Sequence, residues 1–264
     1  MPIIPVIDLR HGLVVRAMRG ERQAYRPIDS PLCGSAEPLA VAGRLCEHCA
    51  TTTLYLADLD ALQGGPVQTG VIAALLRGLP GIELWLDAGF RDRDAIDALQ
   101  RALGADAARL IPVLASEALA SREALRRCRE AAPQAPLSLD RRGAAALDPA
   151  GLWDAPDLWP DTLIVMTLDR VGSGGGPDLD TLAAVRARAP QSRLIGAGGL
   201  RDAADLAACA AAGAAGWLVA SALHDGGLSA TDCRAYGRAG HTLWQPSAGL
   251  HKPARRTDNG TCFA

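Results

Sequence analysis

Short aliphatic runs alternate with longer amphipathic stretches along most of the chain. The runs lack the alternation of a half-exposed strand, and the stretches between them repeat apolar side chains every three or four positions. Aliphatic strands separated by helices are typical of parallel pairing with both faces covered. We therefore expect strands at 3–8, 52–57, 82–87, 109–114, 136–140, 162–168, 193–197 and 215–220, and helices at 37–49, 67–78, 92–103, 117–132, 148–153, 179–189, 202–212 and 228–238.

Eight strand–helix units are the number that closes a (β/α)8 TIM barrel. The alternative is an open doubly wound sheet, but no strand here is followed by the glycine-rich dinucleotide fingerprint with its later acidic residue. We predict the α/β class and a single barrel over residues 1–240. The loop 9–36 is long enough to be a lid or binding loop, and the polar, aperiodic segment 241–264 is predicted to be a mobile C-terminal tail.

Composition excludes several classes of function. A net charge of -2 with three Tyr and two Phe argues against nucleic-acid binding. No apolar run reaches the roughly 18 residues needed to span a bilayer, and no signal peptide precedes the first strand, so we expect a cytoplasmic protein without a membrane partner. Lys252 is the only lysine, which argues against lysine-dependent aldolase chemistry. The sequence leaves the oligomeric state open.

The cysteines give little sign of a metal or redox centre. The seven cysteines form no regular framework, and most are expected to be small buried hydrophobic residues. Cys46-x-x-Cys49 encloses His48, but it falls in the first helix and has no second pair of ligands. We expect no metal and no cofactor.

Two motifs occur twice. "PVIDLRHG" at 5–12 matches "LSLDRRG" at 137–143, and "DAGFRD" at 87–92 matches "GAGGLRD" at 196–202. The first pair falls on the first and fifth expected strands, and the second pair follows the third and seventh. This spacing predicts two half-barrels with a common plan.

These motifs resemble a known family. "IIPVIDLRHGLVVRAMRG", "LYLADLDAL", "DAGFRD", "IGAGGLRD" and "VASALHDG" occur in the order seen in the histidine-biosynthesis family of phosphoribosylformimino-aminoimidazole carboxamide ribotide isomerase and imidazole glycerol phosphate synthase cyclase, with closer similarity to the isomerase. The resemblance covers residues 2–226. It implies a ribulose-phosphate-binding barrel, a phosphorylated small-molecule substrate and an Amadori-type aldose–ketose isomerisation in which Asp8 and Asp140 transfer the protons.

The chain departs from the family pattern at several turns. Val171 stands where relatives have a second aspartate, Ser116 and Ala220 occupy turns that usually carry glycine, and Asp87 replaces the first residue of a triple glycine. The drift indicates a paralogue similar to the clade of methanogens and methylotrophs that is linked to methanopterin or methanofuran cofactor synthesis. One alternative is therefore an enzyme of that one-carbon metabolism acting on a related phosphorylated substrate, and another is a non-catalytic ligand-binding or scaffold barrel.

Three aspartates are candidates for proton transfer. Asp8 and Asp140 end the first and fifth strands, on opposite sides of the barrel mouth, where two carboxylates in different environments can divide acid and base work. Either could instead cap its loop or pair with a neighbouring arginine. Asp169, after the sixth strand, is a third candidate, although it could equally hold the glycine-rich loop that follows.

Backbone amides at the turns are the candidates for phosphate binding. We expect one phosphate at the turns after strands seven and eight and a second, less well retained site at the equivalent turns after strands three and four, where Asp87 and Glu117 add negative charge. The loop after strand six is either a further phosphate cradle or a mobile loop. The candidate residues are Gly198, Gly199, Ala220 and Ser221 for the first site, Gly89, Arg91 and Ser116 for the second, and Ser173 and Gly174 for the loop.

Overall fold

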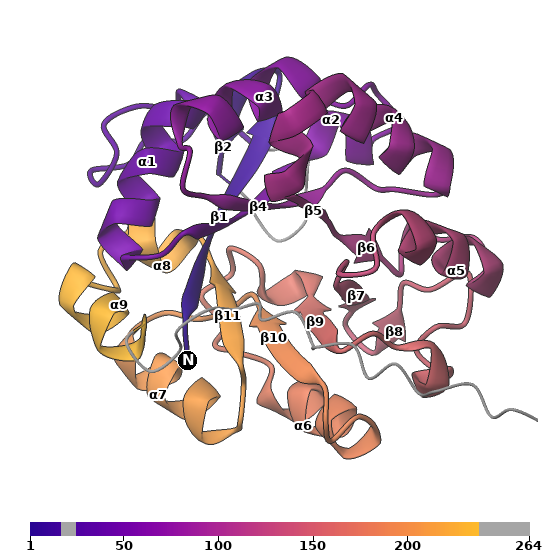
Figure 1. Cartoon of the computed structure of the whole chain (residues 1–264). Helices are drawn as coiled ribbons and strands as arrows, with labels where there is room; N and C mark the ends of the chain where they lie inside the picture. The colour runs from indigo at the N-terminus through magenta and orange to yellow at the C-terminus, as the bar shows by residue number, and fades with distance from the viewer. Residues whose placement is uncertain (17–24, 238–264) are drawn as a thin grey trace, which may run out of the picture.

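A ring of parallel strands surrounded by helices forms the described part of the chain. The structure is a computed structural model that describes residues 1–16 and 25–237, so the predicted tail at 241–264 lies outside the described residues (Figure 1). The strands follow the order β5-β4-β3-β1-β11-β10-β9-β7-β6. Their bounds are β1 (Ile3–Arg10), β3 (Thr53–Asp58), β4 (Glu83–Asp87), β5 (Leu110–Pro112), β6 (Leu114–Ala115), β7 (Leu137–Arg142), β9 (Thr162–Thr167), β10 (Arg193–Ala197) and β11 (Gly216–Val219).

The ring closes through one strand that changes partner halfway. β5 pairs with β4, and β6, one residue further along the same strand, pairs with β7. At the change, the Val113 amide donates to the Leu86 carbonyl at 2.8 Å and the Leu114 amide donates to the Pro136 carbonyl at 3.0 Å. Since β5 and β6 form one barrel strand, the nine strands of the order count as eight, and the prediction of a single (β/α)8 barrel is confirmed.

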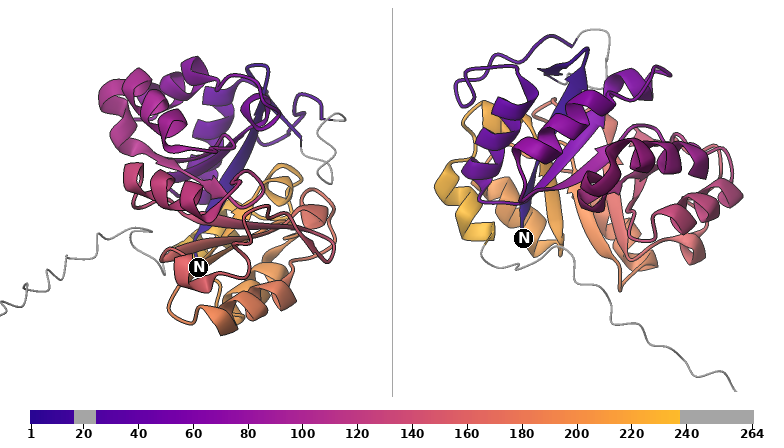
Figure 2. Two further views of the ribbon diagram at one scale, coloured as in Figure 1. Left: turned by 90° about the vertical axis from the view of Figure 1, so that its right-hand side faces the viewer. Right: turned by 45° about the horizontal axis from the view of Figure 1, so that its top comes forward.

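The helices lie outside the strands in both views of Figure 2. Side-chain caps fix several helix starts, because Asp92, Ser121 and Asp202 each accept a hydrogen bond from an amide of the first turn. Each helix in the described ranges is too short or too polar to cross a lipid bilayer. The bounds are α1 (Pro38–Cys49), α2 (Leu59–Leu62), α3 (Thr69–Gly78), α4 (Arg93–Leu103), α5 (Arg122–Ala131), α6 (Leu179–Arg188), α7 (Ala203–Ala211), α8 (Ser221–His224) and α9 (Ala230–Gly237).

One predicted helix is wrong and another starts late. Residues 148–153 form turns, because Gly151 has a φ of 67° and the Asp148 side chain accepts from the Trp153 amide at 2.7 Å. A short 3-10 helix, η3 (Pro156–Leu158), follows these turns. The helix expected from residue 117 begins only at Arg122, where Ser121 caps it.

Two hairpins extend the strands that carry the predicted catalytic aspartates. β2 (Leu13–Val15) returns along β1 and places Val15 opposite Asp8, seven residues earlier. β8 (Ala145–Ala146) returns along β7, and the Leu147 amide donates to the carbonyl of Asp140, again seven residues earlier, at 2.9 Å. The equal offsets support the half-barrel interpretation, which stays a prediction.

The core has two parts, as a barrel requires. Large aliphatic side chains fill the layer between the strands and the helices. A smaller cluster that includes Ile4, Trp85, Ile164 and Ile195 alternates with it along the strands. This alternation places the smaller cluster inside the ring, beneath the strand ends at which the next features lie.

Candidate functional site

A cavity of about 430 Å³ opens at the carboxyl ends of the strands. It brings together residues from all eight barrel strands or the turns that follow them, which matches the usual place of a barrel active site. Of the predicted site residues, eight line it and four do not. Those that line it are Asp8, Asp140, Ser173, Gly174, Gly198, Gly199, Ala220 and Ser221, and those outside the lining are Asp169, Gly89, Arg91 and Ser116.

Asp140 is held rigidly at the end of β7. Its side chain is 4% exposed, and its Oδ1 accepts from the Ser138 hydroxyl at 2.6 Å. Oδ2 accepts from the Ser116 hydroxyl at 3.3 Å and from the Glu117 amide at 3.4 Å. Ser116, proposed from the sequence as a phosphate ligand, is itself fully buried and also donates to the Leu147 carbonyl at 2.9 Å. The structure therefore places Ser116 against the carboxylate and not in the cavity lining.

Burial is the main reason that the pKa of Asp140 lies well above its ordinary value. The negative charges of Glu117 and Asp87 raise it further, whereas the Ser138 hydroxyl and the Glu117 amide lower it. Asp8, at the end of β1, is only half-buried and lines the same cavity. The two aspartates thus occupy the different environments that an acid–base pair needs.

Tyr55 lies where the acidic side chains converge, and no site prediction from the sequence named it. It is buried on β3, lines the cavity, and donates its hydroxyl proton to Asp87 Oδ2 at 3.1 Å. Burial and then the negative charges of Asp87, Asp140 and Asp8 raise its pKa well above the ordinary value. Because all three carboxylates act on one hydroxyl, the strand ends of β1, β4 and β7 are brought close together around Tyr55.

The turns after β10 and β11 form the other side of the cavity. Gly198 and Gly199 have φ values of 85° and 80°, and a Cβ on Gly199 would come within 2.0 Å of the Gly176 carbonyl oxygen. Glycine is therefore required for the loop after β9 to pack on this turn. Among the described residues, no acceptor is recorded for the amides of Gly199 and Ser221, so both amides are available to a ligand.

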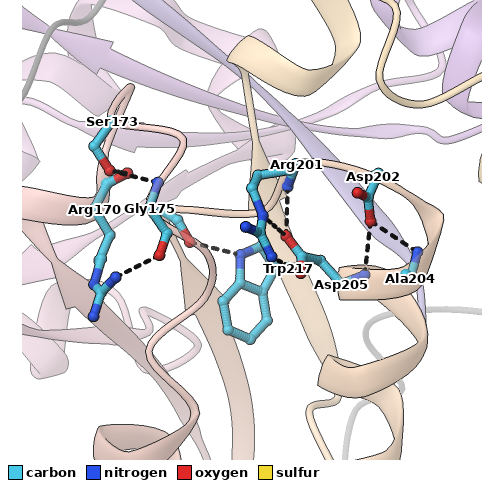
Figure 3. Close-up of polar contacts among 9 residues, drawn as sticks. Arg170, Ser173, Gly175, Arg201, Asp202, Ala204, Asp205 and Trp217 are labelled. Carbon is cyan, nitrogen blue, oxygen red and sulfur yellow. Dashed lines mark hydrogen bonds and ion pairs between the residues drawn. The ribbon is translucent and has the colours of Figure 1, made fainter.

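Two arginines flank the loop that follows β9 (Figure 3). Arg170 donates to the Gly175 carbonyl, and the Ser173 hydroxyl donates to the Arg170 carbonyl at 2.9 Å. Arg201, after β10, forms two hydrogen bonds of 2.7 and 2.8 Å with the Asp205 carboxylate. Both arginines line the cavity, so this side carries positive charge next to the glycine turn.

Asp169 makes a hydrogen bond outside the cavity. Its carboxylate accepts from the Gly143 amide at the tip of the β7–β8 hairpin, and Asp169 is absent from the cavity lining. This contact ties the turn after β9 to the hairpin that carries Asp140. The contact is with this hairpin and not with the glycine-rich loop that Asp169 was expected to hold, and a part of Asp169 in proton transfer stays a prediction.

The long first loop reaches the cavity at two points. Arg16 and Tyr25 both line it, and residues 17–24 lie outside the described residues. Arg16 is paired with Asp225, which follows α8. Ser30 Oγ lies 2.9 Å from His224 Nδ1, and burial lowers the pKa of His224 to about 4, so this histidine is neutral at pH 7.

The Cys-x-x-Cys segment does not contribute to this cavity. Cys46 and Cys49 lie on α1, none of them lines the cavity, and His48 Nε2 is 3.0 Å from the Leu228 carbonyl oxygen. Within the described ranges, no group of three or more His, Cys, Asp or Glu side chains has the arrangement of a metal site.

Comparison with known proteins gives matches along most of the chain. A family model described as "Histidine biosynthesis protein" matches residues 2–229. An uncharacterized protein of Methanocaldococcus jannaschii is 28% identical over 229 residues, which covers 86% of this chain and 95% of that protein. The 1-(5-phosphoribosyl)-5-((5-phosphoribosylamino)methylideneamino) imidazole-4-carboxamide isomerase of Halorhodospira halophila is 31% identical over 245 residues, covering 86% and 94%. The isomerase of the same name from Xanthomonas campestris is 29% identical over 255 residues, covering 88% and 98%.

Proposed function

Because the chain belongs to the histidine biosynthesis protein family, we propose that its cavity binds a phosphorylated sugar derivative and isomerises it by proton transfer. The observation that carries this proposal is the joint placement of Asp8, Asp140 and the Gly198–Gly199 turn around one cavity at the strand ends. Relatives named as carboxamide isomerases support the reaction type. The chain is then an enzyme of the isomerase type with a phosphorylated small-molecule substrate.

Asp140 is assigned the role of general acid. A carboxyl group whose pKa lies well above its ordinary value keeps its proton nearer to neutral pH and can give it to a sugar ring oxygen. Protonation breaks the bond between the ring oxygen, which becomes a hydroxyl, and carbon one, and the nitrogen lone pair forms a protonated imine with carbon one. Ser138 and Ser116 fix the carboxyl group for this transfer.

Asp8 is assigned the role of general base. As a half-buried carboxylate on the opposite strand, it removes the proton from carbon two of the open imine, and the electron pair moves to form an enol-amine. Asp8 returns this proton to carbon one, the hydroxyl proton on carbon two passes to the Asp140 carboxylate, and the ketose forms with both aspartates in their starting states. The substrate phosphate is bound by the amides of Gly199 and Ser221, which lie on the side of the cavity with Arg170 and Arg201.

Substitution of the two carboxylates tests the proposal. Asp8→Asn and Asp140→Asn should each lower kcat on the carboxamide ribotide by roughly 100-fold to 10,000-fold, because each removes a proton-transfer group. Asp157→Asn, at an exposed position of η3, is the matched control and should retain full activity. Rescue of a histidine auxotroph that lacks the isomerase supports this substrate, and unchanged activity in both strand-end variants would end the carboxylate mechanism.

A second candidate is an isomerase of methanopterin- or methanofuran-linked one-carbon metabolism. The β4 turn favours it, since Asp87 changes the part of the cavity where a substrate with two phosphates would place the second one. A third reading, a scaffold without catalysis, is disfavoured by the open cavity and the ordered Asp140. Well-folded protein that fails to rescue the auxotroph would favour the second candidate over the first.

A further inference from the structure

The turn after β4 has the backbone of a phosphate-binding turn, but its amide is already used. Gly89 has a φ of 64°, and its amide donates to the Oδ1 of Asp87, two residues earlier, at 3.1 Å. The other oxygen of the same carboxylate accepts from Tyr55 at 3.1 Å. Asp87 is 7% exposed and lines the cavity, whereas Gly89 does not, so an anion at this end of the cavity meets the Asp87 carboxylate and not the Gly89 amide.

The neighbouring turn after β6 is closed in the same way. The Ser116 amide donates to the Ser138 carbonyl at 2.8 Å, and the Glu117 amide faces Asp140 Oδ2 at 3.4 Å. The carboxylate of Glu117 lines the cavity as well. A phosphate placed here would have to break hydrogen bonds within the protein and approach at least two carboxylates.

The space beside Gly89 is also taken. A Cβ at Gly89 would meet the Leu62 side chain at 3.3 Å, and Leu62 lines the cavity. At the equivalent Gly199, the nearest group is the Gly176 carbonyl of the glycine loop, and the Arg170 and Arg201 side chains stand near that loop (Figure 3). One end of the cavity thus presents amides and the Arg170 and Arg201 side chains, and the other presents carboxylates, a tyrosine and an aliphatic side chain, together with Arg142 of β7.

From these contacts we infer that Asp87 is a specificity-determining residue: it restricts the enzyme to substrates with a single phosphate, whose opposite end is an uncharged or cationic hydrogen-bond donor. The inference rests on the proposed function, because it assumes that the Gly199 side holds the one phosphate. It adds the substrate class and favours the second candidate of the proposed function, because the carboxamide ribotide named for the relatives carries two phosphoribosyl groups. Rescue of the histidine auxotroph would therefore overturn the inference.

Binding of two sugar phosphates tests the inference with the full chain. Isothermal titration should show that ribulose 5-phosphate binds at least about tenfold more tightly than ribulose 1,5-bisphosphate, because one like-charge contact costs on the order of one factor of ten. Asp87→Gly, which restores the glycine and frees the Gly89 amide, should improve bisphosphate binding at least about tenfold relative to monophosphate binding. Asp87→Asn keeps the size of the side chain and removes its charge, so it should give an intermediate gain.

The outcomes separate the inference from the proposed function. Equal or tighter binding of the bisphosphate to the unmodified protein would overturn the inference alone, and loss of that binding in Arg142→Ala would then assign the second phosphate to the β7–β8 hairpin. An unchanged ratio in folded Asp87→Gly would also overturn it. Binding of neither sugar phosphate would overturn the proposed function, and the inference with it. The ratio in the unmodified protein needs no variant, so it decides the matter even if a variant fails to fold.

Discussion

The turns after β4 and β10 have one backbone plan and different side chains. Both run from a strand end through a glycine with positive φ, at Gly89 and Gly199, to an aspartate that caps the next helix. In the first turn, Asp87 occupies the position that Ala197 has in the second, and its carboxylate binds the glycine amide. Under the proposed function, the side chain two residues before the glycine decides whether such a turn attracts or repels an anion.

The arginine of each turn shows a related difference. Arg201 is held by Asp205 of α7, whereas the position of Asp205 is occupied on α4 by Ala95. Arg91 is exposed and has no recorded side-chain partner among the described residues, and it does not line the cavity. The two turns therefore share the Arg-Asp sequence, but their arginines make different contacts.

The largest effect is expected when the two glycines are replaced. Gly199→Ala should destabilise the fold by roughly 3 kcal/mol, because the new Cβ clashes with the Gly176 carbonyl at 2.0 Å and a positive φ strains it. Gly89→Ala should cost only about 1 kcal/mol, since its Cβ meets a movable Leu62 side chain at 3.3 Å. Urea unfolding of both variants measures the difference. Equal losses would mean that the close packing of the β9 loop on the β10 turn contributes little.

Transplanting the aspartate should convert one turn into the other. Ala197→Asp places a carboxylate beneath Gly199, as Asp87 stands beneath Gly89, and should weaken ribulose 5-phosphate binding by about 100-fold through repulsion and loss of the amide. Ala197→Asn, of the same size without the charge, is the control and should lose less. Titration calorimetry measures both. Similar losses in the two variants would show that size, not charge, separates the turns.

A third test uses pH, because Asp87 helps to raise the pKa of Asp140, after burial and Glu117, and position 197 has no such group. A carboxyl group with a raised pKa in the folded state stabilises the fold fully below its ordinary pKa of 3.8, and this stabilisation is lost as the pH rises through the folded-state value. Asp140→Asn should therefore flatten the fall in melting temperature between pH 4 and pH 8, at roughly 2–4 °C per kcal/mol. Asp87→Asn should flatten it less. A slope unchanged in Asp140→Asn would contradict the raised pKa.

The smallest effect is expected at Arg91, in the turn after β4. Ala95→Asp would give Arg91 the partner that Arg201 has in Asp205, on an exposed helix start. An exposed pair of this kind adds a few tenths of a kcal/mol at most. The melting temperature should rise by about 1 °C or less at low salt, and the rise should vanish at high salt. A gain that persists in salt would point to packing and not to charge.

The fold was predictable because barrel strands are buried on both faces, and this burial requires the aliphatic runs that the sequence shows. All eight barrel strands lie at the aliphatic runs, and family membership follows the motifs quoted from the sequence. The helix expected at 148–153 was wrong, because a local side-chain contact of Asp148 and the conformation of Gly151 outweigh the apolar spacing. β8 consists of two alanines, which have little preference for strands, so its pairing with β7 could not be predicted from the local sequence.

Site residues at strand ends could be predicted from the sequence. The hydrogen-bond partners of site residues could not, because they come from distant parts of the chain. Asp8 and Asp140 follow directly from their strands and line one cavity. Tyr55 was missed. Residues two apart on a strand point to the same face, so the strand period places Tyr55 and Ala57 on the inward face of β3 and could have identified Tyr55 as a lining residue. The partners of Ser116 and Asp169 depend on turns from elsewhere in the chain, which no local pattern reveals. The clade suggested by the departures, and the roles of the site residues, stay predictions.

The ring of strands closes at the barrel strand formed by β5 and β6, which pairs with a different neighbour in each half. Val113 and Leu114 donate to opposite neighbours, so each flank of the strand is held over only part of its length. Release of either set of hydrogen bonds would turn the closed ring into an open sheet with two bare edges, at low cost compared with opening along β1 and β3. The β6–β7 pairing has two paired positions, fewer than any other neighbouring pair of the ring, so we expect amide hydrogen exchange to begin at this seam.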